Sequence, residues 1–272
     1  MRRAISSIAW HREEESDAAA LIKSLGLDAV EIAPTRLWSD LSQVSQREAL
    51  NYRYFWESFQ LEIVALQALL FGQTELNIFA APAVRAATMD YLKKAVLIGS
   101  WLGARILVFG SPKNRLRGPL SVADANAIAR SFFAELGDWA HQHRVSIGIE
   151  ANPPEYGCDF VTSTQEAASL VAEVASAGFS LHMDLGAALL DNFSHLALAE
   201  RQRLIRSARH FHCSLPFLAA IHPAAAEGLR GLLQMINREE RDPEACMSIE
   251  MRAASASNLQ AIEIALTYCK PC

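Results

Sequence analysis

The sequence lacks the two features that would place the protein in a membrane or outside the cell. No uninterrupted apolar run reaches the ~18 residues that a transmembrane helix needs. Charged residues and glycine interrupt the longest candidates, such as residues 94–99. After two N-terminal arginines the apolar stretch is short, and three glutamates at 13–15 follow too soon for a secretory signal peptide. We therefore expect no membrane partner and no export signal.

Cysteine is also scarce. The 272 residues include five scattered cysteines, Cys158, Cys213, Cys246, Cys269 and Cys272. An odd, scattered set is typical of reduced thiols in the cytoplasm and not of a disulfide framework. The Cys-x-x-Cys at 269–272 has no following helix and no second pair. We interpret it as a frayed terminal segment and not as a redox or metal motif.

Positive charge is not in excess. A net charge of −5 argues against a nucleic-acid-binding protein, because phosphate backbones are bound by basic surfaces. With 51% hydrophobic and 20% charged residues, the composition excludes intrinsic disorder. A chain of this length can bury a sizeable core without a disulfide or metal to hold it together.

What the sequence does contain is a regular alternation of short apolar runs and longer amphipathic segments. We predict strands at residues 4–10, 29–33, 62–67, 105–109, 145–150, 180–184, 209–214 and 247–251. Helices with apolar residues three and four positions apart are predicted at 16–25, 83–102, 121–143, 163–175 and 195–207, among others. Ser163 and Glu166 have the spacing of a capping box, and glycines such as Gly103 separate helices from the next strand.

The alternation predicts the fold. Strict βα order implies parallel strands with right-handed crossovers, and eight strands and eight helices close into a (β/α)8 TIM barrel. A doubly wound sheet is the alternative, but it usually has a glycine-rich turn after the first strand, and residues 10–13 contain no glycine. No linker divides the chain, so we expect one domain over residues 1–272.

Four consecutive predicted strands, the fifth to the eighth, end in an ionisable side chain. These residues are Glu150, Asp184, His212 and Glu250. The active site of such a barrel lies at the C-terminal ends of its strands. A single carboxylate there is commonly a helix cap, but three at one mouth repel one another unless a cation lies between them. Three oxygen donors and one imidazole suit one divalent ion: Mn²⁺, which we expect first, or Mg²⁺, Co²⁺ or Zn²⁺.

The order of these motifs resembles the xylose-isomerase-like TIM barrels, a family of sugar phosphate isomerases and epimerases. The resemblance extends over nearly the whole chain and is carried by residues 8–10, 30–34, 66–72, 108–115, 149–154, 183–186, 211–214 and 248–251. It implies that Glu150, Asp184, His212 and Glu250 ligate one divalent metal. It also implies that Glu150 and Glu250 act as acid and base.

This double role has a chemical reason. Removing a proton next to a carbonyl builds charge on the carbonyl oxygen, and a bound metal stabilises the resulting ene-diolate. One glutamate removes the proton and the other returns it. Return to the opposite face of the same carbon is epimerisation, and return to the neighbouring carbon is aldose–ketose isomerisation. We therefore predict a divalent-metal-dependent isomerase or epimerase of a small sugar or sugar-like polyhydroxy carbonyl compound.

Two positions depart from the ketose epimerases of this family. Many of them carry a histidine three residues after the aspartate of strand six, where this chain has Ala187. They also carry an arginine shortly after the histidine of strand seven, where this chain has Leu215 and its neighbours at 213–217. The family's contacts to a free ketohexose are therefore in question, whereas the four metal ligands are retained.

Five further side chains are candidates for substrate binding: Trp10, Gln67, Lys113, Asn152 and Arg252. Lys113 lies in a loop with Arg115 and Arg117, which either binds a substrate anion or is a solvated basic loop. Asn152 and Arg252 each follow a predicted ligand by two residues, and either reach the substrate or hold that ligand in place. Trp10 forms an apolar wall or fills the core, and Gln67 contacts a hydroxyl.

Other polar residues lie along the same strands. His182 and His210 precede Asp184 and His212 by two residues, so strand alternation places them on the same side of the barrel wall. We expect them to be hydrogen-bonded layer residues and not further ligands. Glu31 ends the second strand and either supports a metal ligand or forms a structural pair. Cys213 and Cys246 are expected to be packing residues.

Three other functions are compatible with parts of this pattern. An inosose-type dehydratase would use the same proton abstraction and then expel a β-hydroxyl. An abasic-site endonuclease would need more metal ligands and a basic face, which the composition does not supply. A non-catalytic barrel would not need the four ionisable residues. Helices of such barrels often form dimer interfaces, and whether this chain is a homodimer stays open.

Overall fold

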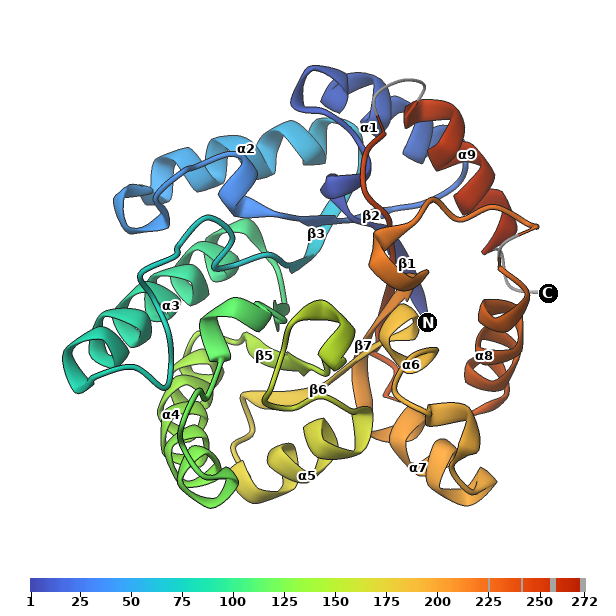
Figure 1. The fold of residues 1–272 in the computed structure, drawn as a ribbon. Helices are drawn as coiled ribbons and strands as arrows, with labels where there is room; N and C mark the ends of the chain where they lie inside the picture. The colour runs from blue at the N-terminus through green and yellow to red at the C-terminus, as the bar shows by residue number, and fades with distance from the viewer. Residues whose placement is uncertain (225, 241, 255–257, 270–272) are drawn as a thin grey trace.

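A computed structural model describes residues 1–224, 226–240, 242–254 and 258–269 of the chain. Its eight parallel strands form one sheet in the order β1-β8-β7-β6-β5-β4-β3-β2. Their bounds are β1 (Arg2–Ile5), β2 (Ala29–Ile32), β3 (Glu62–Leu66), β4 (Ile106–Phe109), β5 (Ser146–Glu150), β6 (Phe179–Asp184), β7 (Ala208–Ser214) and β8 (Cys246–Glu250). Strands adjacent in sequence are adjacent in the sheet, which is the order expected of consecutive βα units (Figure 1).

The sheet curls into a nearly closed barrel. Its two end strands, β1 and β2, meet at an isolated parallel bridge between Ser6 and Glu31. The remaining neighbours pair through continuous parallel ladders, with register shifts after Val30 and after Leu181. The prediction of a (β/α)8 barrel is confirmed.

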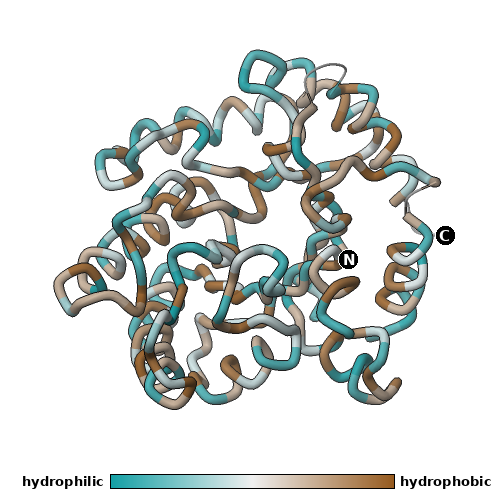
Figure 2. The backbone as a smooth tube through the Cα atoms, in the orientation of Figure 1, coloured by the Kyte–Doolittle hydropathy of each residue, from teal (hydrophilic) through white to brown (hydrophobic). Residues whose placement is uncertain are grey.

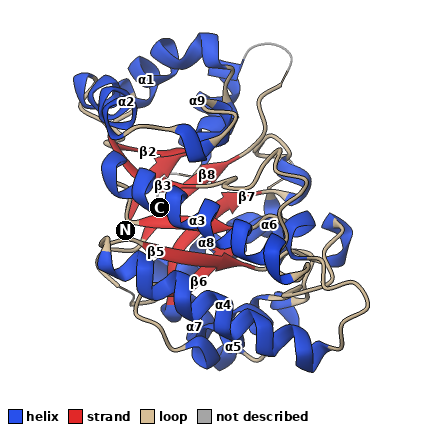
Figure 3. Cartoon of the chain, turned by 90° about the vertical axis from the view of Figure 1, so that its left-hand side faces the viewer, coloured by secondary structure: helices blue, strands red, loops and turns tan. Residues whose placement is uncertain are grey.

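Helices surround the strands on the outside (Figures 1 and 3). Their bounds are α1 (Glu15–Ser24), α2 (Gln46–Ser58), α3 (Pro82–Leu102), α4 (Val122–Gln142), α5 (Thr164–Val174), α6 (Leu185–Ala188), α7 (Leu198–Ser207), α8 (Glu227–Arg238) and α9 (Asn258–Tyr268). Hydrophobic and hydrophilic residues recur along these helices, as amphipathic packing against a barrel requires (Figure 2). The described ranges thus hold one helix more than the eight predicted, the single-turn α6.

Local signals explain several helix ends. The Ser163 hydroxyl accepts a hydrogen bond from the Glu166 N–H and caps α5, as predicted. The reciprocal half of the capping box is wrong, because the Glu166 carboxylate accepts from the N–H of Thr162 at 2.6 Å. Gly103 ends α3 in the left-handed region with φ of 88°, where glycine carries no side-chain penalty.

Three predicted boundaries are wrong. The first strand begins at Arg2 and not at residue 4, and it ends at Ile5 and not at residue 10, because the Ser6 hydroxyl caps a 3₁₀ turn at Ser7–Ala9. The helix α7 begins at Leu198 and not at residue 195, since residues 193–195 form a separate 3₁₀ turn. The limits of the other seven predicted strands agree with the structure to within one residue.

Two expectations from the sequence concern membrane-spanning segments and cysteine pairing. None of the helices in the described ranges combines the length and apolarity that a bilayer-spanning segment needs. Cys158, Cys213, Cys246 and Cys269 are free and buried, and the Sγ atoms of Cys213 and Cys269 lie 3.1 Å apart. Cys272, the second residue of the Cys-x-x-Cys, lies outside the described residues.

Candidate functional site

The ends of β5 to β8 bring the predicted ionisable residues to one mouth of the barrel. Asp184 on β6 is the register partner of His212 on β7, and Glu250 on β8 is that of Ser214. Glu150 ends β5 in register with His182. The parallel register therefore sets Asp184 level with His212, whereas Glu150 is level with a residue two positions before Asp184 and Glu250 with a residue two positions after His212.

Three of the four predicted metal ligands form a compact group. Among the described residues, Asp184, His212 and Glu250 offer donor atoms that all lie within 4.8 Å of one another, and all three residues are buried. The Nδ1 atom of His212 lies 3.2 Å from Glu250 Oε2 and 3.9 Å from Asp184 Oδ2. Within the described ranges this buried nitrogen has no hydrogen-bond partner. A nitrogen without a partner between two carboxylates is suited to a metal ion.

Glu31 lies behind His212. Its carboxylate is fully buried and accepts from His212 Nε2 at 3.0 and 3.2 Å. In the neutral imidazole, which is the form that binds metal, Nε2 keeps its proton in this hydrogen bond and the lone pair is on Nδ1, which faces Asp184 and Glu250. Glu31 therefore orients His212. That His212 is a metal ligand, and that Glu31 thus supports one, stays a prediction.

Asp184 is held by two hydrogen bonds. Its Oδ1 accepts from the N–H of Ala187 at 2.5 Å and so caps α6, and its Oδ2 accepts from the Ser214 hydroxyl at 2.5 Å. Asp184 therefore caps a helix and also belongs to the group of three residues whose donor atoms could hold a metal ion. The cap explains why the chain forms the short α6 directly after β6.

Glu150 lies beside the three-residue group. Among the described residues it is not one of the donors within 4.8 Å, and its Oε2 lies 4.0 Å from His182 Nε2. The Asn152 amide donates to Glu150 Oε1 at 2.7 Å. Gly110 on the neighbouring loop leaves room for the carboxylate, since a Cβ there would lie 2.8 Å from Glu150 Oε2. That Glu150 is a fourth ligand stays a prediction.

The electrostatics of the site disfavour three ionised carboxylates. Burial, together with the negative charges of Asp184 and Glu250, raises the pKa of Glu150 to about 8. Burial and the charge of Glu250 raise the pKa of Asp184 to about 6. Burial alone would lower the pKa of His212, but the charges of Glu250 and Glu31 outweigh it and raise that pKa well above 6.5. A divalent cation would compensate this excess of negative charge.

His182 and His210 form a buried layer below the mouth. Their Nδ1 atoms lie 3.0 Å apart in a hydrogen bond, and His210 Nε2 lies 3.2 Å from the Ser248 hydroxyl. Burial lowers the pKa of both imidazoles. Their nitrogens also lie within 4.8 Å of a nitrogen of His212. Because each uses Nδ1 to bond the other, the geometry favours the predicted layer role.

The predicted substrate residues are placed differently from one another. Trp10 is 1% exposed, and its ring centroid lies 6.1 Å from that of Trp56, which favours the core-filling alternative. Gln67 is buried and donates to the Ser6 hydroxyl. Asn152 holds Glu150, as described above, while Lys113 and Arg252 are exposed. That these five residues contact substrate stays a prediction.

Sequence reasoning missed the role of Arg115, which it assigned to a loop that either binds a substrate anion or is a solvated basic loop. Arg115 is fully buried and donates from Nη2 to the Glu150 carbonyl at 2.7 Å. Its Nε donates to the Cys158 sulfur at 3.3 Å, and its Nη1 has no partner among the described residues. It therefore ties the β4–α4 loop to the end of β5. Nothing in a run of three cations distinguishes the buried one.

Tyr156 and Phe217 were also missed. They lie in the loops after β5 and β7, with ring centroids 5.3 Å apart and an interplanar angle of 70°. Burial and the charges of Asp184, Glu150 and Glu250 raise the pKa of Tyr156 to about 12. The Tyr156 hydroxyl accepts from the Phe217 N–H at 3.2 Å, in the loop that follows Ser214, a hydrogen-bond partner of Asp184. An aromatic residue after Pro153 and Pro154 was the only sequence signal.

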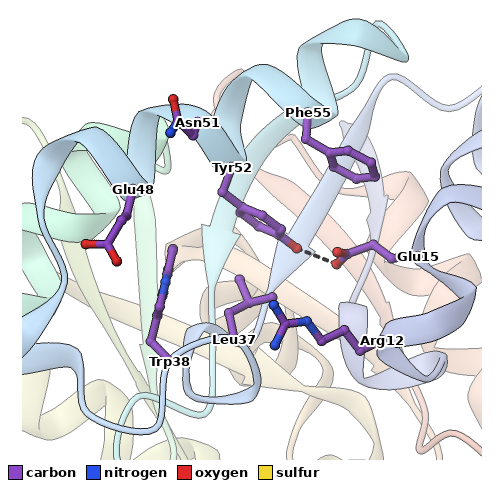
Figure 4. Close-up of a pocket in the computed structure, with 8 residues that line it drawn as sticks. All are labelled: Arg12, Glu15, Leu37, Trp38, Glu48, Asn51, Tyr52 and Phe55. Carbon is purple, nitrogen blue, oxygen red and sulfur yellow. Dashed lines mark hydrogen bonds between the residues drawn. The ribbon is translucent and has the colours of Figure 1, made fainter.

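A separate open cavity of about 400 Å³ lies among the loops after β1 and β2 and the start of α2 (Figure 4). Trp38, Tyr52 and Phe55 supply its aromatic lining, and Tyr52 donates to Glu15 Oε1 at 2.5 Å. Burial raises the pKa of Glu15. The cavity is lined by none of the predicted site residues.

Comparison with known proteins places the fold. A family model described as xylose isomerase-like TIM barrel matches residues 19–222. An L-ribulose 3-epimerase structure is similar with a TM-score of 0.75 and 13% identity, covering 98% of this chain and 92% of that one. A 3-keto-D-glucoside 4-epimerase from E. coli is similar with a TM-score of 0.72 and 14% identity, covering 99% of this chain and 98% of that one. An IOLI protein with a bound zinc atom is similar with a TM-score of 0.68 and 16% identity, covering 98% of this chain and 96% of that one. No curated protein matches the sequence.

Proposed function

Since the chain belongs to the xylose isomerase-like TIM barrel family, we propose that it is a divalent-metal-dependent isomerase or epimerase of a small sugar-like polyhydroxy carbonyl compound. Neighbours in fold include an L-ribulose 3-epimerase and a 3-keto-D-glucoside 4-epimerase, and another holds a zinc atom. These neighbours support the substrate class and the metal requirement. The reaction, the metal Mn²⁺ and a cytoplasmic location are part of the proposal.

One observation carries the proposal: the buried Nδ1 of His212, without a partner in the described residues, faces Asp184 and Glu250 while Glu31 fixes the ring from behind. Nδ1 lies at ion-pair distance from Glu250 Oε2, 3.2 Å, but the two atoms do not have hydrogen-bond geometry. The combination of oxygen and nitrogen donors with a supporting carboxylate is typical of metal-ligating histidines. Asp184, His212, Glu250 and Glu150 would hold the ion.

A divalent ion bound there would polarise a substrate carbonyl and its neighbouring hydroxyl. Glu150 and Glu250 would exchange the substrate proton from the two sides of the reacting carbon. In the metal-free site the charges of Asp184 and Glu250 help to raise the pKa of Glu150 to about 8. A bound cation would offset these charges, so the ionised carboxylate could accept the substrate proton. The Asn152 amide, bonded to Glu150 Oε1, would keep that carboxylate in one orientation.

Metal content per chain tests the first half of the proposal. Protein purified without chelator is expected to hold about one divalent ion, and the Asp184→Asn/Glu250→Gln double variant none. Glu155→Gln, an exposed glutamate in the loop after β5, is the matched control and should keep the ion. The absence of ion from wild-type protein after incubation with Mn²⁺, Co²⁺ or Zn²⁺ would refute the proposal.

Deuterium uptake from D₂O into ketoses, aldoses and inososes tests the second half. Wild-type protein should exchange the proton next to the carbonyl of at least one sugar, and Glu150→Gln should lower that rate by about 10²-fold or more. Product analysis then separates epimerisation, isomerisation and the dehydration that an inosose-type lyase would catalyse. A metal-loaded protein that exchanges no proton would leave a non-catalytic barrel.

A further inference from the structure

The loop after β7 carries an exposed aromatic residue in an unfavourable backbone conformation. Phe217, in the 3₁₀ turn Pro216–Leu218, is 62% exposed and has φ of 61°. Leu218 follows with φ of 58°. Two consecutive bulky residues in the left-handed region are strained, and such strain clusters at functional sites.

The loop is held in this conformation by its surroundings. The Phe217 N–H donates to the Tyr156 hydroxyl at 3.2 Å, and the Leu218 carbonyl accepts from the Arg252 N–H at 2.9 Å. These bonds tie the loop to the loops after β5 and β8. The structure thus keeps the Phe217 ring at the surface beside Tyr156, although burial of the ring in the core would be more favourable.

The aromatic pair lies next to the candidate metal ligands. The Tyr156 hydroxyl accepts from the N–H of Phe217, which lies three residues after Ser214 in the loop that follows β7. On the other side, Ser214 bonds Asp184, and the Leu215 carbonyl packs so closely on Gly186 that a Cβ there would lie 2.9 Å from it. The loop therefore begins at a residue that contacts a ligand.

Apolar side chains lie along this flank. Ala187 and Leu215 are both buried, at 1% and 5% exposed. The Phe217 ring offers C–H and van der Waals contact, and it cannot replace the hydrogen bonds of a hydroxyl that loses its water. The flank accordingly suits a part of the substrate without a hydroxyl.

We propose that Tyr156 and Phe217 form an aromatic wall that selects substrates with an apolar terminus, namely deoxy sugars in which a methyl group replaces the terminal CH₂OH. This inference rests on the proposed function, because it assigns the substrate class of the same site. A hydroxyl left without a partner against the wall weakens binding roughly 5- to 100-fold. The deoxy sugar is therefore expected to bind at least about fivefold more tightly than its hydroxylated counterpart.

Matched sugar pairs test the inference. Calorimetric titration of Mn²⁺-loaded protein would compare 6-deoxy-D-fructose with D-fructose, 6-deoxy-L-fructose with L-fructose, and 6-deoxy-L-tagatose with L-tagatose. The expected result is a preference for the deoxy sugar in at least one pair. Phe217→Asn should abolish this preference, since asparagine tolerates the left-handed backbone and removes the ring. Phe217→Tyr should retain it.

Tyr54→Ser provides the control, because Tyr54 is an exposed aromatic residue on α2 away from this loop. It should leave the preference unchanged. Equal binding within every pair, a preference for the hydroxylated sugars, or a preference that survives in Phe217→Asn would overturn the inference. Binding of none of these sugars would also overturn it. Metal content and deuterium exchange report separately on the proposed function, which stands if a fully hydroxylated sugar is turned over.

Discussion

The carboxylate of Glu31 is expected to set the affinity of the site for metal, although it is not a ligand. It accepts from His212 Nε2 at 3.0 Å, and both side chains are fully buried. Glu31→Gln keeps the size of the side chain and an oxygen acceptor but removes the negative charge. The imidazole then becomes a weaker donor to the metal.

The size of the effect follows from this geometry. Removing such a supporting carboxylate typically weakens metal binding about 10- to 100-fold, or about 1.4–2.7 kcal/mol. A second effect opposes it. Glu31 also raises the pKa of His212, and a proton on His212 competes with the metal. Because that competition weakens in the variant, the loss of affinity should be larger at pH 8.5 than at pH 6.5.

Competition with a fluorescent chelator measures the dissociation constant at both pH values. Glu62→Gln is the control, since Glu62 begins the adjacent strand β3 and makes an exposed ion pair with Arg2. Circular dichroism would check that both variants are folded. Equal affinities of the folded Glu31→Gln and Glu62→Gln proteins at pH 8.5 would refute the reasoning.

Three further predictions concern protons and packing. Metal-free protein should lose about 2 kcal/mol or more of unfolding free energy between pH 6.5 and 8. The reason is that Glu150 and His212 have raised pKa values in the folded protein and hold protons that the unfolded chain has released. Urea unfolding in the presence of chelator measures this loss, and a rise in stability would contradict the prediction. Metal binding at pH 7 should release more than one proton, from the same two groups. Titration calorimetry in buffers of different ionisation enthalpy measures the number of protons released. Release of no proton would contradict the raised pKa values of Glu150 and His212. Gly178→Ala should destabilise the fold by about 1–3 kcal/mol, because its Cβ would clash with the backbone oxygen of Gly137 in α4. Gly231→Ala in α8 has open space around it and should stabilise the fold by about 0.5–1 kcal/mol. Thermal unfolding compares the two variants, and similar shifts of their midpoints would contradict the packing argument.

The barrel could be predicted because its signals are local. Buried parallel strands are continuous apolar runs, and a strand such as β6 ends visibly where the apolar run meets Asp184. The same signal singled out Glu150 and Glu250, which end β5 and β8, whereas His212 lies two residues before the end of β7. The first strand was overextended because residues 6–10 remain apolar while the Ser6 hydroxyl turns the chain.

Contacts across the barrel could not be predicted. The pairing of Glu31 with His212 joins residues on β2 and β7, and neither periodicity nor spacing carries information on such a contact. Arg115 resembles its exposed neighbours in sequence and is buried only because the end of β5 needs a donor for the Glu150 carbonyl. Likewise, Tyr156 and Phe217 meet through two loops whose conformations depend on the folded barrel.

Glu31 also stands at the seam of the barrel. Its backbone makes the bridge to Ser6 that joins β1 to β2, and its side chain holds His212 on the opposite strand. Opening of the seam therefore releases the support of the imidazole, so an ion on His212 would be bound by the closed form in preference to the open one. Occupancy would raise the opening free energy by RT ln(1 + [L]/Kd), and the amides of β1 and β2 would exchange their hydrogens more slowly as the ion concentration rises. The last step of barrel closure and the loading of the site would then be a single equilibrium.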